Sequence, residues 1–225
     1  MTFSIVGRCA HTGMLGMAVS SSSPAVAARC AHARAGIGVV STQNVTDPTL
    51  GPRGLDLMAS GRSAGEAIDK IVETAPHIAH RQLLAVDAEG RTATYSGERT
   101  LGIHASAEGL DAAAGGNLLK NESVPSGMLH AFAAHPEDHL GDRLIKAMRA
   151  ALDAGGEEGP VHSIGMLITD KVPWPVVDLR IDWTEDDPIT GLDALWQVYK
   201  PQIDAYVTRA LDPEAAPSYG VPGAV

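Results

Sequence analysis

Apolar positions along the chain recur with two different periods, which predict a mixture of strands and helices. Short extended runs cover residues 2–8 and 15–20, and the Gly-containing loop between them is typical of a β-hairpin. Similar runs bounded by turn residues predict strands over 36–43, 82–86, 92–96, 101–104, 161–168 and 176–181. The runs 82–86 and 92–96 flank a Gly-containing turn and are expected to form a second hairpin.

Helical patterns separate these strands. A short helix is expected over 52–58, with Pro52 suited to its first turn, and a second over 63–72, where Ser63 and Glu66 form a capping box. Two further segments, 125–134 and 137–152, are expected to break at His135-Pro136, with His135 as a cap. A last helix starts at Pro188 and is expected to kink or restart at Pro201 before ending at 211.

Strands and helices occur in clusters along the chain instead of alternating strictly. This order favours antiparallel sheets covered by helices over a doubly wound parallel sheet, and hence an α+β class. We see neither an internal repeat nor an interdomain linker, so we expect a single domain over residues 1–211. The Pro/Ala/Gly-rich segment 212–225 is expected to be a poorly packed tail.

The composition limits the classes of binding partner and the cellular compartment that we expect for this protein. The formal net charge is −10 without a cluster of Lys and Arg, which argues against nucleic acid or an anionic membrane as partner. Two cysteines, Cys9 and Cys30, give no disulfide framework and suit a reducing compartment. The sequence contains no apolar run long enough for a membrane span and no signal-peptide pattern, so we expect a cytoplasmic protein.

The candidate chemistry begins at Thr2, directly behind Met1. A small second residue is the kind that permits removal of the initiator methionine, which would leave Thr2 with a free α-amine. A threonine hydroxyl and its own amine can act together as nucleophile and base. Because the α-amine titrates near pH 7.7–8.0, a useful fraction is unprotonated at neutral pH. The alternative is that Thr2 is simply a strand residue.

Two other polar stretches could contribute to a site. Ser20 and Ser21 open a serine run that ends at Pro24 and either lines a site or forms a loop. Asn117 follows Gly115-Gly116, where the glycines allow close backbone approach or a positive φ. Its amide is a candidate hydrogen-bond donor to a substrate or an oxyanion, and a bulge or turn is the competing interpretation.

Nine histidines raise the question of a metal site. His135 and His139 lie four residues apart with acidic residues between them, but Pro136 separates them and no third ligand has recognisable spacing. A solvated helix start explains the acidic residues equally well, because they complement the helix dipole. We expect neither a metal nor another cofactor.

Several segments in fixed order resemble a bacterial and archaeal family of unknown function that is grouped with the N-terminal-nucleophile (Ntn) hydrolases. The matching segments are TFSIV (2–6), LGMAVS (15–20), ARAGIG (33–38), TQ (42–43), GPRGL (51–55), RQL (81–83) and GN (116–117). The resemblance extends from residue 2 to about residue 200. The chain carries fewer charged residues over 158–163 than the family pattern.

The resemblance implies a four-layer αββα sandwich in which Thr2 supplies both the attacking Oγ and the base. Ser20 and Ser21 would lie near the amine, and Asn117 would help to bind the oxyanion. Four residues that match the family pattern would anchor the substrate or pair structurally: Arg53, Arg81, Gln82 and Gly116.

Two functions from different classes follow, and a third, a metal-dependent hydrolase that uses some of the nine histidines, ranks last. The leading hypothesis is an amidohydrolase that cleaves a small amide or peptide-like bond with Thr2 as nucleophile after Met1 is removed. The alternative is a non-catalytic metabolite-binding or scaffold protein on the same fold that retains Met1. A homo-oligomer is expected on weaker grounds, namely the exposed tail of low charge and the large apolar share of the sequence.

Overall fold

A computed structural model describes residues 1–220 of the chain. The strands are β1 (Thr2–Arg8), β2 (Leu15–Ser21), β3 (Ala31–Arg34), β4 (Gly38–Asn44), β5 (Arg81–Asp87), β6 (Thr92–Ser96), β7 (Ala105–Gly109), β8 (Ala112–Asn117), β9 (Ser163–Thr169) and β10 (Pro175–Ile181). The helices are α1 (Ala27–Cys30), α2 (Leu50–Ala59), α3 (Ala64–Thr74), α4 (Val124–Ala133), α5 (Leu140–Asp153), α6 (Pro188–Tyr199) and α7 (Ile203–Leu211), with short 3₁₀ turns η1 (Ile78–His80) and η2 (Lys200–Gln202).

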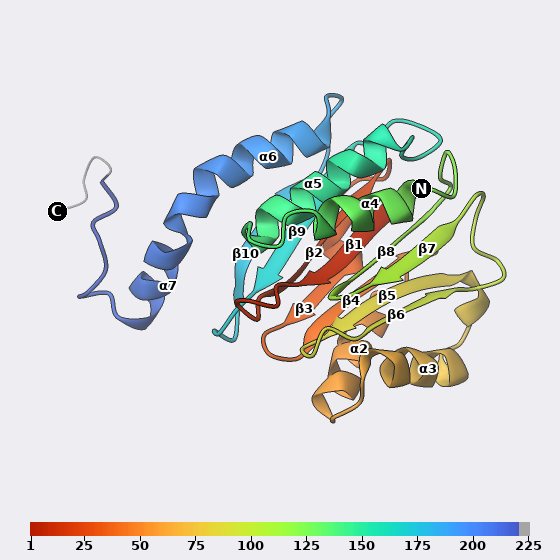
Figure 1. The fold of residues 1–225 in the computed structure, drawn as a ribbon, viewed down its shortest axis with the longest axis horizontal. Coiled ribbons are helices and arrows are strands. Elements are labelled where there is room, and N and C mark those ends of the chain that lie inside the picture. The colour runs from red at the N-terminus through yellow and green to blue at the C-terminus, as the bar shows by residue number, and fades with distance from the viewer. Residues whose placement is uncertain (221–225) are drawn as a thin grey trace.

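Two antiparallel sheets form the centre of the molecule. One has six strands in the order β10-β9-β2-β1-β8-β7, and the other has four in the order β3-β4-β5-β6. Helices α4, α5 and α6 cover the outer face of the larger sheet, while α2 and α3 cover the outer face of the smaller one (Figure 1). The predicted α+β class and αββα layering are therefore confirmed.

Three hydrophobic clusters correspond to the three interfaces between these layers. Phe3 and Ile5 of β1 pack toward the helices, whereas Val6 belongs to the cluster between the sheets, with Leu84 of β5. A third cluster joins β4 and β5 to α2 and α3. Because side chains alternate along a strand, Thr2 and Ser4 belong to the same face of β1 as Val6, the face between the sheets.

The glycines of β8 serve close packing and not a turn. Neither Gly115 nor Gly116 has a positive φ, and both pair regularly with β1. A Cβ on Gly115 would lie 2.9 Å from Leu84 Cδ2 of the opposite sheet, and one on Gly116 would lie 2.6 Å from Leu119 Cδ2. The prediction of close approach is therefore confirmed, while the bulge or turn considered for this segment is wrong.

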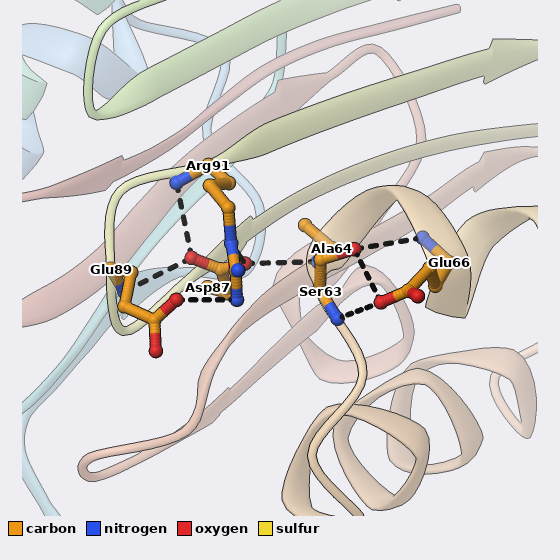
Figure 2. A network of polar contacts seen from close by, with 6 residues as sticks. All are labelled: Ser63, Ala64, Glu66, Asp87, Glu89 and Arg91. Atoms are coloured by element: carbon orange, nitrogen blue, oxygen red, sulfur yellow. Dashed lines mark hydrogen bonds and ion pairs between the residues drawn. The ribbon is translucent and has the colours of Figure 1, made fainter.

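The capping box predicted at the start of α3 is present, and the helix is tied to the β5–β6 hairpin. Ser63 Oγ accepts from the Glu66 N–H, and the Glu66 carboxylate accepts from the Ser63 N–H. Figure 2 shows the adjoining Asp87, whose carboxylate accepts from the Ala64 N–H at 3.0 Å and from Arg91 Nε at 2.7 Å. The Arg91 N–H donates to the same carboxylate.

Two sequence predictions need correction, and two elements were not predicted. No strand forms over 101–104, because Gly102 has a φ of +59°, outside the extended region, and the strand β7 follows instead. Helix α5 begins at Leu140, and its cap is His139, whose Nδ1 accepts from the Gly141 N–H, not His135. The segment before β4, for which no element was predicted, contains α1 and the edge strand β3, which lacks the apolar alternation that would predict a strand.

The last helical segment follows the prediction. Pro201 lies in the 3₁₀ turn η2 between α6 and α7, and α7 lies near the β10 edge, away from most of the sandwich (Figure 1). Residues 212–220 form neither helix nor strand, and residues 221–225 of the predicted tail lie outside the described residues. Among residues 1–220, no helix has both the length and the apolar character needed to cross a membrane. The single domain over 1–211 stays a prediction.

Candidate functional site

Thr2 opens the central strand of the larger sheet, between β2 and β8. The residue is 6% exposed, and its Oγ1 lies 2.5 Å from the Met1 carbonyl oxygen and 3.4 Å from Ser21 Oγ. The Ser21 hydroxyl donates to the same carbonyl oxygen at 2.5 Å and lies 2.8 Å from Ser23 Oγ. Two hydroxyl groups therefore contact the carbonyl of the peptide bond that precedes Thr2, and a third, that of Ser23, contacts Ser21.

Ser20 and Ser21 differ in their surroundings because adjacent strand residues face opposite sides of the sheet. Ser21 shares the inter-sheet face of β2 with Met17 and Val19 and meets Thr2. Ser20 is fully buried, and its hydroxyl donates to the Ser163 carbonyl of the neighbouring strand β9 at 2.9 Å. Ser21 is thus in contact with Thr2, while the hydrogen bond of Ser20 secures the end of β2.

Asn117 lies directly opposite Thr2 in the pairing of β1 with β8. Its amide nitrogen donates to Gln82 Oε1 at 3.2 Å, and Gln82 Nε2 donates to the Gly116 carbonyl at 3.0 Å. Gln43 Nε2 also donates to Gln82 Oε1, at 2.8 Å. Gln82 therefore connects the two sheets and holds the Asn117 amide, which has a second N–H for another acceptor.

Glu157 adds a buried carboxyl group that the sequence analysis missed. It follows α5, and its backbone bridges Leu119, two residues beyond Asn117. The side chain of Glu157 is buried, and Oε2 accepts from the Ser22 N–H at 3.3 Å. Burial raises the pKa of this carboxyl to about 7, against an opposing effect of the N-terminal ammonium group. A protonatable group therefore lies beside the hydroxyl cluster.

Arg53 and Arg81 make their contacts in other parts of the molecule. Arg53 is on α2, and its guanidinium donates to the Thr74 hydroxyl at the end of α3. Arg81 begins β5 beside Gln82, and its guanidinium donates to the Val45 carbonyl. The hydrogen bonds of these two arginines thus join parts of the smaller sheet and its helices, whereas Gln82 and Gly116 belong to the network around Asn117.

Sequence reasoning missed further members of this site for a common reason. Gln43, Ser23 and Glu157 reach it from segments that are far apart in the chain or, for Ser23, lie in an apparent loop. Arg29 also reaches it through Ser23, since its Nη2 donates to Ser23 Oγ at 2.6 Å. Two signals were available: the serine run that ends at Pro24, considered as a site lining or a loop, and the pair Thr42-Gln43 within the resembling segments. Among residues 1–220, no three His, Cys, Asp or Glu side chains are grouped as metal ligands would be.

Fold and site together define an αββα sandwich with a hydroxyl cluster at the start of its central strand. The model of the family described as "Family of unknown function (DUF1028)" matches residues 2–192, so the chain belongs to this family. It is similar to the crystal structure of protein SPO2555 from Silicibacter pomeroyi, a protein matched to the same family model, with 30% identity, 88% of each chain covered and a TM-score of 0.81.

A more distant likeness concerns Anbu (ancestral beta-subunit) from Yersinia bercovieri. It has 12% identity, covers 91% of this chain and 97% of its own, and has a TM-score of 0.38. No curated protein matches the chain in sequence.

Proposed function

We propose that this protein is an Ntn hydrolase that cleaves small amide or peptide-like bonds, with Thr2 as nucleophile once Met1 is removed. The observation that carries the proposal is the position of the Thr2 hydroxyl. It lies at the first residue of the central strand, within 3.4 Å of Ser21 Oγ and beside the peptide bond whose loss would free the Thr2 amine. An N-terminal threonine so placed combines nucleophile and base in one residue.

The reaction then proceeds by acyl transfer. The free amine of Thr2 accepts the hydroxyl proton as Oγ attacks the carbonyl carbon of the substrate, and the C–N bond breaks as the leaving amine takes that proton. Water hydrolyses the resulting ester and regenerates the hydroxyl. The second N–H of Asn117 and the Ser21 hydroxyl are the donors suited to the developing oxyanion, since both residues neighbour Thr2.

The other site residues act by positioning in this proposal. Gln82 holds the Asn117 amide and the Gly116 carbonyl, and Ser20 fixes β2 against β9. For Arg53 and Arg81 we propose structural pairing in place of substrate anchoring. Their hydrogen bonds to Thr74 and Val45 support that choice.

Variants at position 2 test this function. On a panel of small amides, protein starting at Thr2 should turn over substrate, whereas Thr2→Ala should lose about a thousandfold or more, because removing a nucleophile leaves only the residual effect of binding. Thr2→Ser keeps a hydroxyl and an amine and should retain measurable activity. The melting temperature of Thr2→Ala should stay close to that of the wild type. Undiminished turnover by Thr2→Ala would reject the proposal.

A second candidate is supported by the contacts of Met1 itself. The Met1 carbonyl accepts hydrogen bonds from Thr2 and Ser21, and the Met1 side chain lies against Gly159. A protein that keeps Met1 would have its Thr2 amine blocked and would bind a metabolite without cleaving it. Intact mass separates the two candidates, because only the first requires loss of Met1.

We further propose a cytoplasmic, homo-oligomeric protein whose partner is a small-molecule amide and not nucleic acid. The net charge of −10 supports the exclusion of nucleic acid. Exposed apolar side chains on α6 and α7, among them Val198 and Leu211, support association between copies. A monomer mass in sedimentation velocity at micromolar concentration would contradict the association.

A further inference from the structure

Met1 lies between two segments that meet only in the folded chain. On one side is the end of β2, where Ser21 Oγ donates to the Met1 carbonyl at 2.5 Å. On the other is the loop after α5, where a Cβ built on Gly159 would lie 3.3 Å from Met1 Cε and 3.9 Å from Met1 Sδ. The backbone carbonyl and the side chain of Met1 therefore each have a defined neighbour.

The same two segments are joined by Glu157, which has an unused acceptor. Glu157 is 5% exposed as a residue, its Oε2 accepts from the Ser22 N–H at 3.3 Å, and its Oε1 is buried without a hydrogen-bond partner anywhere in residues 1–220. A buried carboxylate oxygen without a donor costs free energy, so such groups in proteins are normally satisfied. One buried acceptor of the site, Glu157 Oε1, therefore lacks a hydrogen-bond donor among residues 1–220.

The charge of the chain's own N-terminus indicates what kind of donor fits. The N-terminal ammonium group lowers the pKa of Glu157 against the larger opposing effect of burial. The ammonium group on the α-carbon of residue 1 thus acts on this carboxyl through its charge, without a hydrogen bond to either carboxyl oxygen among residues 1–220. Removal of Met1 would take away the carbonyl, the side chain and the ammonium group together, and would leave the residues that surround them.

We propose that the space filled by Met1 is the acyl pocket of the enzyme, and that its substrates are amides of α-amino acids with a free α-ammonium group. Glu157 binds that ammonium group, Ser21 contacts the carbonyl, and Gly159 leaves room for an unbranched side chain such as that of methionine. This inference rests on the proposed function, since the pocket opens only when Met1 is lost.

The reaction with such a substrate balances without a further reactant. Thr2 Oγ forms an ester with the aminoacyl carbonyl, the C–N bond to the leaving amine breaks, and the hydroxyl proton reaches that amine through the α-amine of Thr2. Water then cleaves the ester, releasing the amino acid and restoring the Thr2 hydroxyl. Glu157 takes no part in the bond changes and acts on binding alone.

Binding to an inactive variant tests the pocket apart from catalysis. In Thr2→Ala protein lacking Met1, we expect calorimetry at pH 7 to show L-methioninamide binding at least about tenfold more tightly than N-acetyl-L-methioninamide. A charge-assisted hydrogen bond accounts for that factor. Adding Glu157→Gln should abolish the preference for L-methioninamide. The matched control Glu158→Gln, at the exposed neighbouring residue, should preserve it. Equal binding of the two amides, or a preference that survives Glu157→Gln, would overturn the proposal.

A second variant tests the side-chain part of the pocket. Gly159→Val places methyl groups where the Met1 side chain lies, so L-methioninamide should bind several-fold more weakly while glycinamide binds as before. Unchanged binding of L-methioninamide to a folded Gly159→Val protein would contradict the placement.

Turnover by protein with a free Thr2 separates this inference from the proposed function. If N-acetyl-L-methioninamide is cleaved as fast as L-methioninamide, the proposed pocket for an α-ammonium group is contradicted, while the hydrolase function is supported. If L-methioninamide binds more tightly than N-acetyl-L-methioninamide but neither amide is cleaved, the hydrolase function is contradicted and the proposed pocket is retained.

Discussion

Single side chains in this protein take their roles from the face of the strand on which they lie. Ser20 and Ser21 are neighbours in sequence, yet one hydroxyl donates to the Ser163 carbonyl while the other meets Thr2. The family resemblance implied that both serines lie near the amine, and only the strand register could separate their surroundings. Glu157 was not predicted at all, because its position beside Ser22 depends on a bridge to Leu119, 38 positions away in the chain.

Glu157 should make the stability of the protein depend on pH. Burial raises its folded-state pKa from 4.5 to about 7, so the native state binds the proton more tightly than the unfolded state. The contribution of this tighter proton binding to the free energy of unfolding is fully present below pH 4.5 and is lost as the pH rises through 7. At 1.36 kcal/mol per pKa unit the loss is roughly 3 kcal/mol.

Glu157→Gln removes this titration. The free energy of unfolding of the variant relative to the wild type should therefore rise by roughly 3 kcal/mol between about pH 4.5 and pH 8 in urea titrations. The exposed Glu158, changed to Gln, should leave the pH profile of the wild type unchanged. A constant difference between Glu157→Gln and the wild type across that range would contradict the buried, protonatable carboxyl.

At the scale of elements, the sequence predicted best where local chemistry decides the structure. The capping box of α3 and the restart at Pro201 depend on residues next to one another, and both are present. Strand β3 and the start of α5 were missed because they depend on partners distant in the chain. For α5, the cap is His139, whose ring packs against Trp196 of α6 at 5.0 Å between centroids.

Asp87 joins α3 to the β5–β6 hairpin, so its loss should destabilise both elements. Burial alone would raise the pKa of this carboxyl, but the N–H groups of Ala64, Arg91 and Glu89 and the Arg91 guanidinium together lower it (Figure 2). Asp87→Asn should cost about 2–4 kcal/mol at neutral pH, because buried donors lose a charged acceptor.

The pH dependence of this cost has a definite sign. A lowered pKa means that the stability is present above pH 3.8 and is lost as the pH falls further, so the difference from the wild type should shrink in acid. Glu89→Gln is the control, since the exposed Glu89–Arg91 pair should contribute less than about 1 kcal/mol. Urea titrations at pH 7 and pH 3 measure the destabilisation caused by Asp87→Asn and by Glu89→Gln. A destabilisation by Asp87→Asn that is equal at the two pH values would contradict the lowered pKa of Asp87.

Gly115 should be required for the approach of the two sheets. A Cβ there would lie 2.9 Å from Leu84 Cδ2, so Gly115→Ala should destabilise the protein by about 1–3 kcal/mol through overpacking. Gly109→Ala on the edge strand β7 is the matched control. Its Cβ would meet Leu129 Cδ1 at 3.6 Å, and the change should be neutral or stabilising by up to about 1 kcal/mol. Equal effects of the two substitutions in denaturant unfolding would contradict this account.

For the whole molecule, the αββα layering was predicted through the resemblance, whereas the strand patterns alone favoured only antiparallel sheets covered by helices. The pattern could not order the strands, since β1 lies between β2 and the distant β8. That order is what brings Asn117 opposite Thr2 and places the start of the chain beside Ser21 and Glu157. The proposed chemistry therefore depends on the assembled sheet and on whether the chain truly starts at Thr2.

The intact mass of untagged protein purified from its native host shows whether the chain starts at Thr2. We expect a mass lower than that of the full sequence by one methionine residue, which means that Thr2 carries a free α-amine beside its hydroxyl. Complete retention of Met1 would contradict the account, because the Thr2 hydroxyl would then lack its base and the acyl pocket would stay filled.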